Sequence, residues 1–171
     1  MTVPTEPVVV AVSGVKNSGK TTLITQMLPR LAAAGLRTAV IKHDGHRFLP
    51  EPTRTDTGRA LAAGAWGAAI FDGETYKVVR REAVDETRLL SFFSDADLIL
   101  LEGFKHSPWP KLELIREGNS QRPVCDPATL LALVTDLPIR LPGVPRVPFG
   151  DAAEATGIVL DYVYQGGGRH A

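Results

Sequence analysis

The chain has 171 residues, of which 44% are hydrophobic, and its 19 basic and 19 acidic residues give a formal net charge of +0. This length suits one well-buried domain, and the balanced charge gives no general electrostatic reason to bind nucleic acid or an anionic membrane. The longest apolar runs, such as Leu98–Leu101 and Leu130–Val134, are too short to cross a bilayer. Met1–Pro7 lacks the layout of a signal peptide, and the single cysteine, Cys125, fits a reducing compartment. We therefore expect a cytoplasmic α/β domain with no nucleic-acid or membrane partner.

The first part of the chain predicts a strand, a helix and a second strand. Val8–Ser13 is a continuous, β-branched run of the kind found in strands buried on both faces. Lys20–Ala34 has helical spacing of apolar residues and is closed by Gly35. Pro29 lies inside this pattern, so we expect it to kink the helix or end it early. Thr38–His43 predicts the second strand.

The middle of the chain predicts a loop, a short helix and an inserted hairpin. Asp44–Thr55 is polar and carries two prolines, and a loop of this length suggests function. Asp56–Ala65 indicates a helix that leads into a strand over Trp66–Phe71. Asp72–Gly73 predicts a tight turn, and Thr75–Arg81 an antiparallel return strand.

The second half of the chain predicts further strands and two helices. The expected elements are a helix over Asp85–Phe93, strands over Leu98–Leu101, Lys111–Arg116 and Leu130–Val134, a short segment over Val144–Val147, and a final helix from Asp151 to about Tyr164. Lys111–Arg116 alternates polar and apolar residues, which favours an edge strand. The element order predicts a mainly parallel sheet with helices on both faces and an inserted antiparallel β-hairpin. We expect one domain over residues 1–165 and a flexible tail over 166–171.

A phosphate-binding loop follows the first predicted strand. Gly14–Thr21 satisfies the pattern G-x-x-x-x-G-K-[ST] in full. Glycines let the backbone N–H groups point at phosphate oxygens, and the start of the next helix adds its positive dipole end. Lys20 would reach the β- and γ-phosphates, and the Thr21 hydroxyl would ligate Mg²⁺. The expected nucleotide-binding residues of this segment are Gly14, Lys16, Asn17, Ser18, Gly19, Lys20, Thr21 and Thr22.

Two further segments end at the edge of the sheet where this loop opens. A P-loop protein needs an acid after a neighbouring buried strand to hold Mg²⁺ directly or through water, and Glu102 follows Leu98–Leu101 in this way. Lys42 and His43 end the second predicted strand, so we expect them to face the γ-phosphate. The sequence offers no residue in an evident catalytic position.

Taken together, these segments resemble the MobB family, the adapter proteins of molybdopterin guanine dinucleotide synthesis. The resemblance is carried by Gly14–Thr22, Val40–His43, Asp56-Thr57 with Ala63–Ala65, Leu98–His106, Lys111–Arg116 and Thr135–Pro138. The run Glu-Gly-Phe-Lys-His at 102–106 is the most distinctive part. The sequence departs from the family pattern at Gly45, where a histidine is usual, and in the segment around Arg54, where the family lysine is missing.

The resemblance implies a dimeric P-loop NTPase-type domain that binds GTP with Mg²⁺ and hydrolyses it weakly at best. It also implies association with a MobA-type guanylyltransferase, the enzyme that joins GMP to molybdopterin. The resemblance leaves open whether Arg54 replaces the missing lysine.

Asp136 is the candidate for recognising the base. It follows the strand Leu130–Val134 at the ligand edge of the sheet, where a carboxylate can accept both N1–H and N2–H₂ of guanine. A turn or cap aspartate before Leu137-Pro138 explains the same residue equally well, and it is the family resemblance that favours GTP.

Two other functions compete with the GTP-binding adapter, and a homodimer is expected. A small-molecule kinase or ligase of the same fold lacks support, because no arginine-rich lid is evident. A metallochaperone GTPase would need a richer set of soft or imidazole ligands than one cysteine and four histidines. We also expect a homodimer built through the hairpin and the Lys111–Arg116 strand, since a lone hairpin needs a surface to pack on.

Overall fold

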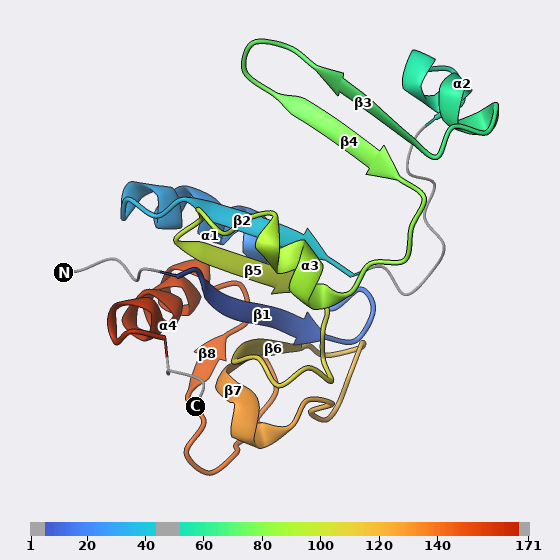
Figure 1. Ribbon diagram of the computed structural model, residues 1–171. Helices are drawn as coiled ribbons and strands as arrows, with labels where there is room; N and C mark the ends of the chain where they lie inside the picture. The colour runs from blue at the N-terminus through green and yellow to red at the C-terminus, as the bar shows by residue number, and fades with distance from the viewer. Residues whose placement is uncertain (1–5, 44–51, 168–171) are drawn as a thin grey trace. The chain divides into compact units, whose positions relative to one another are not determined.

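A six-stranded parallel sheet is the frame of the larger of two units (Figure 1). The structure is a computed structural model that describes residues 6–43 and 52–167. The strands follow the spatial order β2-β5-β1-β6-β7-β8, and every pairing in this sheet is parallel. They are β1 (Val8–Gly14), β2 (Thr38–Lys42), β5 (Leu98–Glu102), β6 (Lys111–Ile115), β7 (Leu130–Thr135) and β8 (Arg146–Pro148). The carboxyl ends of all six strands therefore meet at one edge.

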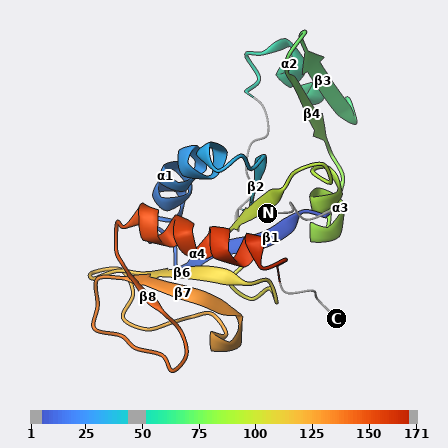
Figure 2. The ribbon, with the colours of Figure 1, turned by 90° about the vertical axis from the view of Figure 1, so that its left-hand side faces the viewer.

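Helices and loops cover both faces of this sheet, as expected. Helices α1 (Lys20–Ala33) and α4 (Ala152–Tyr164) lie on one face (Figure 2), where side chains such as Met27 and Val159 pack against strand residues with no exposed surface. On the other face, Leu89 and Leu90 from the end of α3 (Glu86–Ser91) pack with Trp109 against the strands. No helix in the described part of the chain has the length and apolar character needed to cross a bilayer.

The expectation of an edge strand over Lys111–Arg116 is wrong. Strand β6 lies inside the sheet, between β1 and β7, and all five of its residues are buried. The alternation arises because Lys111 and Glu113 are buried ionisable groups rather than solvent-facing ones. Lys111 Nζ donates to the Ser107 carbonyl oxygen, and Glu113 Oε1 accepts the Val124 N–H at 2.6 Å. A buried strand whose polar side chains form internal hydrogen bonds therefore has the same alternation of polar and apolar residues as a half-exposed strand.

The expected early end of the helix at Pro29 is wrong, whereas a kink at this position stays a prediction. Helix α1 continues past Pro29 to Ala33. The turn after the helix ends at Gly35, which has a positive φ. Pro29 is exposed, whereas Met27 and Leu31 on either side of it are fully buried. Their packing stabilises the helix and offsets the loss of the backbone hydrogen bond that proline cannot donate.

The smaller unit spans residues 44–88 and holds the expected hairpin. It contains α2 (Asp56–Ala62) and the antiparallel pair β3 (Gly67–Phe71) and β4 (Tyr76–Arg80). The predicted turn is confirmed, since Asp72 Oδ1 accepts the N–H groups of Glu74 at 2.9 Å and Thr75 at 2.7 Å.

The remaining expectations concern the final helix and the division of the chain into domains. The final helix begins where expected, and Asp151 caps it through a 2.9 Å hydrogen bond from the Glu154 N–H to its Oδ1. A short 3-10 helix, Pro127–Thr129, precedes β7. That residues 1–165 fold as a single domain stays a prediction, because the chain divides into residues 1–43 with 89–171 and residues 44–88.

Candidate nucleotide site

The phosphate loop joins β1 to α1 in a conformation that depends on its glycines. Gly14 and Gly19 have φ values of 136° and 98°, in a region that favours glycine. A Cβ at Gly14 would lie 2.6 Å from the Leu114 carbonyl oxygen, so no other residue fits there without displacing β6. Asn17 between them also has a positive φ, 60°, which asparagine tolerates better than most residues. The motif therefore has the curled backbone that the sequence predicted.

The Lys20 side chain lies back over this loop. Its Nζ donates to the Val15 carbonyl oxygen at 2.7 Å and lies 3.4 Å from that of Gly14. Burial lowers the pKa of Lys20, and the neighbouring Glu102 carboxylate partly opposes that shift. Lys42 and Lys105 lower the pKa further through charge repulsion. Cationic side chains thus converge on the loop, and an anion bound among them would relieve their repulsion.

Glu102 meets Thr21 and Lys42 at the carboxyl end of β5. Thr21 Oγ1 donates to Glu102 Oε1 at 2.7 Å, and Lys42 Nζ lies 2.8 Å from the same oxygen. The sheet register explains the contact, because Lys42 and Glu102 are directly paired between β2 and β5. The Glu102 side chain is only 7% exposed. Its charge therefore interacts with its neighbours more strongly than it would in bulk water.

This pair of oxygens fits a magnesium ion. Mg²⁺ takes oxygen ligands and commonly keeps one or two protein contacts together with water and phosphate oxygens. Thr21 Oγ1 and Glu102 Oε1 are of the right chemistry and lie side by side at the phosphate loop. Within residues 6–43 and 52–167 there is no group of three or more His, Cys, Asp or Glu side chains that could hold a metal by themselves.

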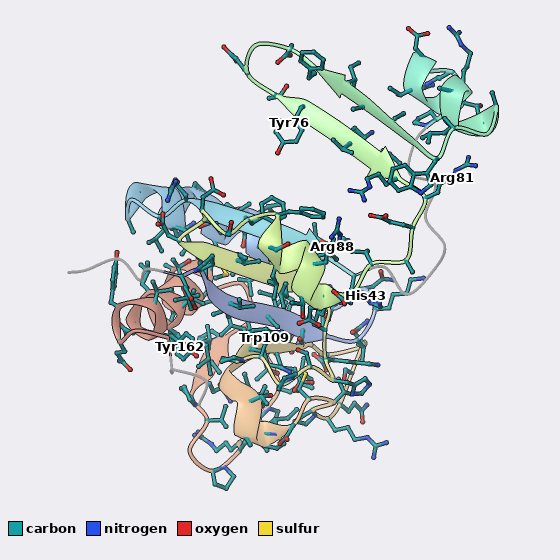
Figure 3. All side chains as sticks on the ribbon, in the orientation of Figure 1. His43, Tyr76, Arg81, Arg88, Trp109 and Tyr162 are labelled. Carbon is teal, nitrogen blue, oxygen red and sulfur yellow. The ribbon has the colours of Figure 1, made fainter. Side chains whose placement is uncertain are left out.

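His43 follows β2 and lies at the same edge of the sheet (Figure 3). Its N–H donates to the Glu102 carbonyl oxygen at 3.1 Å, and its ring centroid lies 5.5 Å from that of Phe104. Lys105 and His106 are exposed beyond Phe104. The part of the histidine-bearing loop that includes Gly45 and His46 lies outside the described residues.

Asp136 lies further along the edge, because β6 separates its strand β7 from β1. It is exposed, and its Oδ1 accepts the Glu117 N–H at 2.9 Å. Asp136 therefore holds the loop after β6, and each carboxylate oxygen retains lone pairs for a further donor. Its role in recognising the base stays a prediction.

Two residues outside every predicted motif also reach the loop. Asn119 Nδ2 donates to the Lys16 carbonyl oxygen at 3.0 Å, and its Oδ1 is buried without a hydrogen-bond partner in the described part of the chain. A Cβ at Gly19 would lie 3.2 Å from Cζ of Phe149, so that ring packs directly on the loop. Neither residue belongs to a motif. Only the position of Phe149, just after the strand β8, could have suggested it.

The sequence and the structure together define the class of this protein. A parallel sheet with helices on both faces, and a glycine loop of this pattern between its first strand and first helix, constitute a P-loop NTPase-type fold. The family model described as "MobB: Molybdopterin guanine dinucleotide synthesis protein B" matches residues 9–136. This chain belongs to the MobB family.

Curated relatives agree with this assignment. The chain is 35% identical to the probable molybdopterin-guanine dinucleotide biosynthesis adapter protein of Bacillus subtilis (strain 168) over 113 residues, covering 64% of this chain and 65% of that protein. It is 32% identical to the molybdopterin-guanine dinucleotide biosynthesis adapter protein of Escherichia coli (strain K12), covering 72% of this chain and 75% of that protein. The match thus spans just under two thirds of the first relative's length.

Solved structures share the fold over most of the chain. The crystal structure of Bacillus subtilis MobB superposes with a TM-score of 0.74 at 29% identity, covering 90% of this chain and 96% of that one. The MobB homologue from Bacillus stearothermophilus, at 21% identity and a TM-score of 0.67, shares the fold.

Proposed function

We propose that this chain is a Mg²⁺-dependent GTP-binding adapter in molybdenum cofactor biosynthesis. The contact between Thr21 Oγ1 and Glu102 Oε1, at 2.7 Å beside the phosphate loop, carries the nucleotide part of the proposal. The names of the relatives, molybdopterin-guanine dinucleotide biosynthesis adapter proteins, support the pathway. The alternatives, a small-molecule kinase or ligase and a metallochaperone GTPase, gain no support from the family comparison.

Each group at the site would have a distinct task. The loop N–H groups and Lys20 would bind the β- and γ-phosphates, and Lys42 would add a second positive charge. Thr21 and Glu102 would hold Mg²⁺, which when bound neutralises charge on the phosphate oxygens. Asp136 would favour guanine by accepting its two donors.

We expect slow turnover from this set of groups. Fast P-loop hydrolases position the attacking water with a dedicated side chain and add an arginine to the transition state. In the described part of the larger unit, no arginine forms a hydrogen bond or ion pair with Thr21 or Glu102. We therefore propose weak intrinsic GTP hydrolysis, with any acceleration supplied by a partner.

The partner in this proposal is a MobA-type guanylyltransferase, which joins GMP to molybdopterin. An adapter of this kind should bind that enzyme and change its rate of dinucleotide formation when GTP is present. A pull-down with the purified transferase, followed by a rate assay, tests this part. No association and no change of rate would contradict the adapter role while leaving nucleotide binding intact.

The metal ligands are tested by the magnesium dependence of binding. Wild-type protein should bind a non-hydrolysable GTP analogue more tightly with Mg²⁺ than with EDTA. Glu102→Gln should lose most of that difference, because an amide is a poor Mg²⁺ ligand. Glu154→Gln, an exposed change on α4, is the matched control and should keep it. An unaltered magnesium effect in Glu102→Gln would remove Glu102 from the site.

We also propose a homodimer formed through the hairpin. Phe71, Tyr76 and Val78 lie on one face of β3 and β4 and are 81%, 80% and 54% exposed, and Figure 3 shows Tyr76 on β4. A hairpin of two strands is marginally stable alone, and an exposed apolar face of this kind is typical of an interface. The buried position of β6 removes the other strand that was expected to contribute.

A further inference from the structure

We propose that the groove between α1 and the loop joining β8 to α4 is the nucleobase subsite of the nucleotide site. The groove has a volume of about 480 Å³ and is lined by Gln26 and Arg30 of α1 and by the segment from Pro148 to Ala153. This volume lies within the usual range for small-molecule sites. The inference rests on the proposed function, since it assigns a place to the base of a nucleotide held by the phosphate loop.

The groove adjoins the phosphate loop through Phe149. Its ring is one wall of the groove, and Cζ of the same ring would lie 3.2 Å from a Cβ at Gly19. Gly19 directly precedes Lys20 in the motif. The phosphate loop and the groove therefore share the Phe149 ring as a neighbour.

The spacing of residues along α1 gives the direction and the reach. Thr22, Gln26 and Arg30 are four residues apart, so they share one exposed face of the helix. Each step along that face rises about 6 Å, from about 1.5 Å per residue. A nucleotide whose phosphates bind at the start of α1 would place its sugar beside Thr22 and its base near Gln26. Of these three residues, Gln26 and Arg30 line the groove.

The lining has the chemistry of a base-binding surface. An aromatic ring and a guanidinium both stack on planar heterocycles, and a glutamine amide can both donate to and accept from a base edge. The Arg30 side chain lies along α1 beside Gln26, because its Nη1 donates to the Gln26 carbonyl oxygen at 2.8 Å. Asp151 also lines the groove, and its Oδ1 caps α4.

The sheet register places Asp136, the residue predicted to recognise guanine, at the same edge of the sheet as Phe149. Thr135 of β7 pairs with Pro148 of β8, and the residues that follow them are Asp136 and Phe149. Parallel strands lie about 4.8 Å apart, so these two residues start from neighbouring positions. Stacking in the groove and hydrogen bonding from Asp136 would act on one base.

Comparing GTP with inorganic tripolyphosphate separates the base from the phosphates. Both are titrated calorimetrically with Mg²⁺ into wild type, the double variant Gln26→Ala/Arg30→Ala and the control Thr25→Ala. All three positions are exposed, and Thr25 does not line the groove. We expect the double variant to bind GTP about tenfold more weakly, as for the loss of one stacked or hydrogen-bonded base contact. Tripolyphosphate affinity should be the same in all three proteins.

Other outcomes overturn either this inference or the proposal beneath it. If wild type binds neither ligand, the nucleotide site itself is wrong and the subsite falls with it. If GTP binds no more tightly than tripolyphosphate, or the double variant binds GTP as wild type does, the base lies elsewhere. Equal loss of both ligands would mean that the groove acts on the phosphate loop and holds no base.

Discussion

At the scale of single residues, Glu102 Oε1 is the proposed magnesium ligand and already contacts two hydrogen-bond donors. It accepts from Thr21 Oγ1 at 2.7 Å and lies 2.8 Å from Lys42 Nζ, which itself lies 3.5 Å from the Thr21 hydroxyl. The Lys42 ammonium thus contacts both predicted magnesium ligands. In the nucleotide-free protein, the lysine and a divalent cation should compete for the same oxygen.

Replacing Lys42 tests this competition directly. Lys42→Met should raise the affinity of the nucleotide-free protein for Mn²⁺, used as a spectroscopic substitute for Mg²⁺. The gain should be about two- to fivefold, since a partly exposed ion pair contributes up to about 1 kcal/mol. Electron paramagnetic resonance of free Mn²⁺ measures it. Lys105→Met removes a charge near Lys20 but no bond to Glu102, so it is the control; equal effects of both variants would reduce the role of Lys42 to general charge.

Cys125 should be chemically inert in the folded protein. Burial raises the pKa of its thiol to about 12, and the nearby Glu113 carboxylate adds to that shift. The thiolate is the reactive form, so at pH 8 almost none is present. Ellman's reagent should detect no thiol in native protein and one equivalent after unfolding in guanidinium. Fast labelling of the native protein would mean that the segment around Cys125 opens readily.

At the scale of elements, the hairpin carries the prediction on assembly. Light scattering at micromolar concentration should give about twice the chain mass of 18.4 kDa. Phe71→Ser/Tyr76→Ser should lower the mass to that of one chain, because it removes the two most exposed aromatic side chains of the apolar face. Glu74→Ala at the turn is the control. A wild-type mass near 18.4 kDa would exclude the dimer.

Strand β6 shows why the sequence could predict the elements but not the place of each one in the sheet. The alternation over Lys111–Ile115 is the same for a half-exposed edge strand and for an inner strand whose polar side chains bond internally. The difference depends on partners far along the chain: the N–H groups of Val124 and Cys125 for Glu113, and the Ser107 carbonyl for Lys111. Single-sequence patterns do not contain such contacts. Helix α1 passed Pro29 for a similar reason, since buried neighbours outweighed a local preference.

The candidate site divides in the same way between local and long-range information. The loop conformation follows from Gly14 and Gly19, and the contact of Thr21 with Glu102 follows from a buried strand that ends in an acid. These were predictable because each depends on a short segment and on the geometry of parallel sheets. Asn119 and Phe149 reach the loop from residues about 100 and 130 positions later, through tertiary packing that no motif encodes.

At the scale of the whole molecule, every proposed role requires that the loop Gly14–Thr21 bind a nucleoside triphosphate. The fold places that loop at the carboxyl edge of the sheet, with Lys20, Lys42 and Glu102 around it. The base subsite, the magnesium ligands and the adapter role all depend on this binding.

Calorimetric titration of a non-hydrolysable GTP analogue, with Mg²⁺, into wild type and Lys20→Ala tests this binding most directly. The wild type should bind, and the variant should bind about 30-fold more weakly or not at all, because truncating one partner of a close charge pair costs about 2 kcal/mol or more. Circular dichroism of the variant should match that of the wild type. Equal affinity in a folded Lys20→Ala protein would contradict the assignment of the phosphate site.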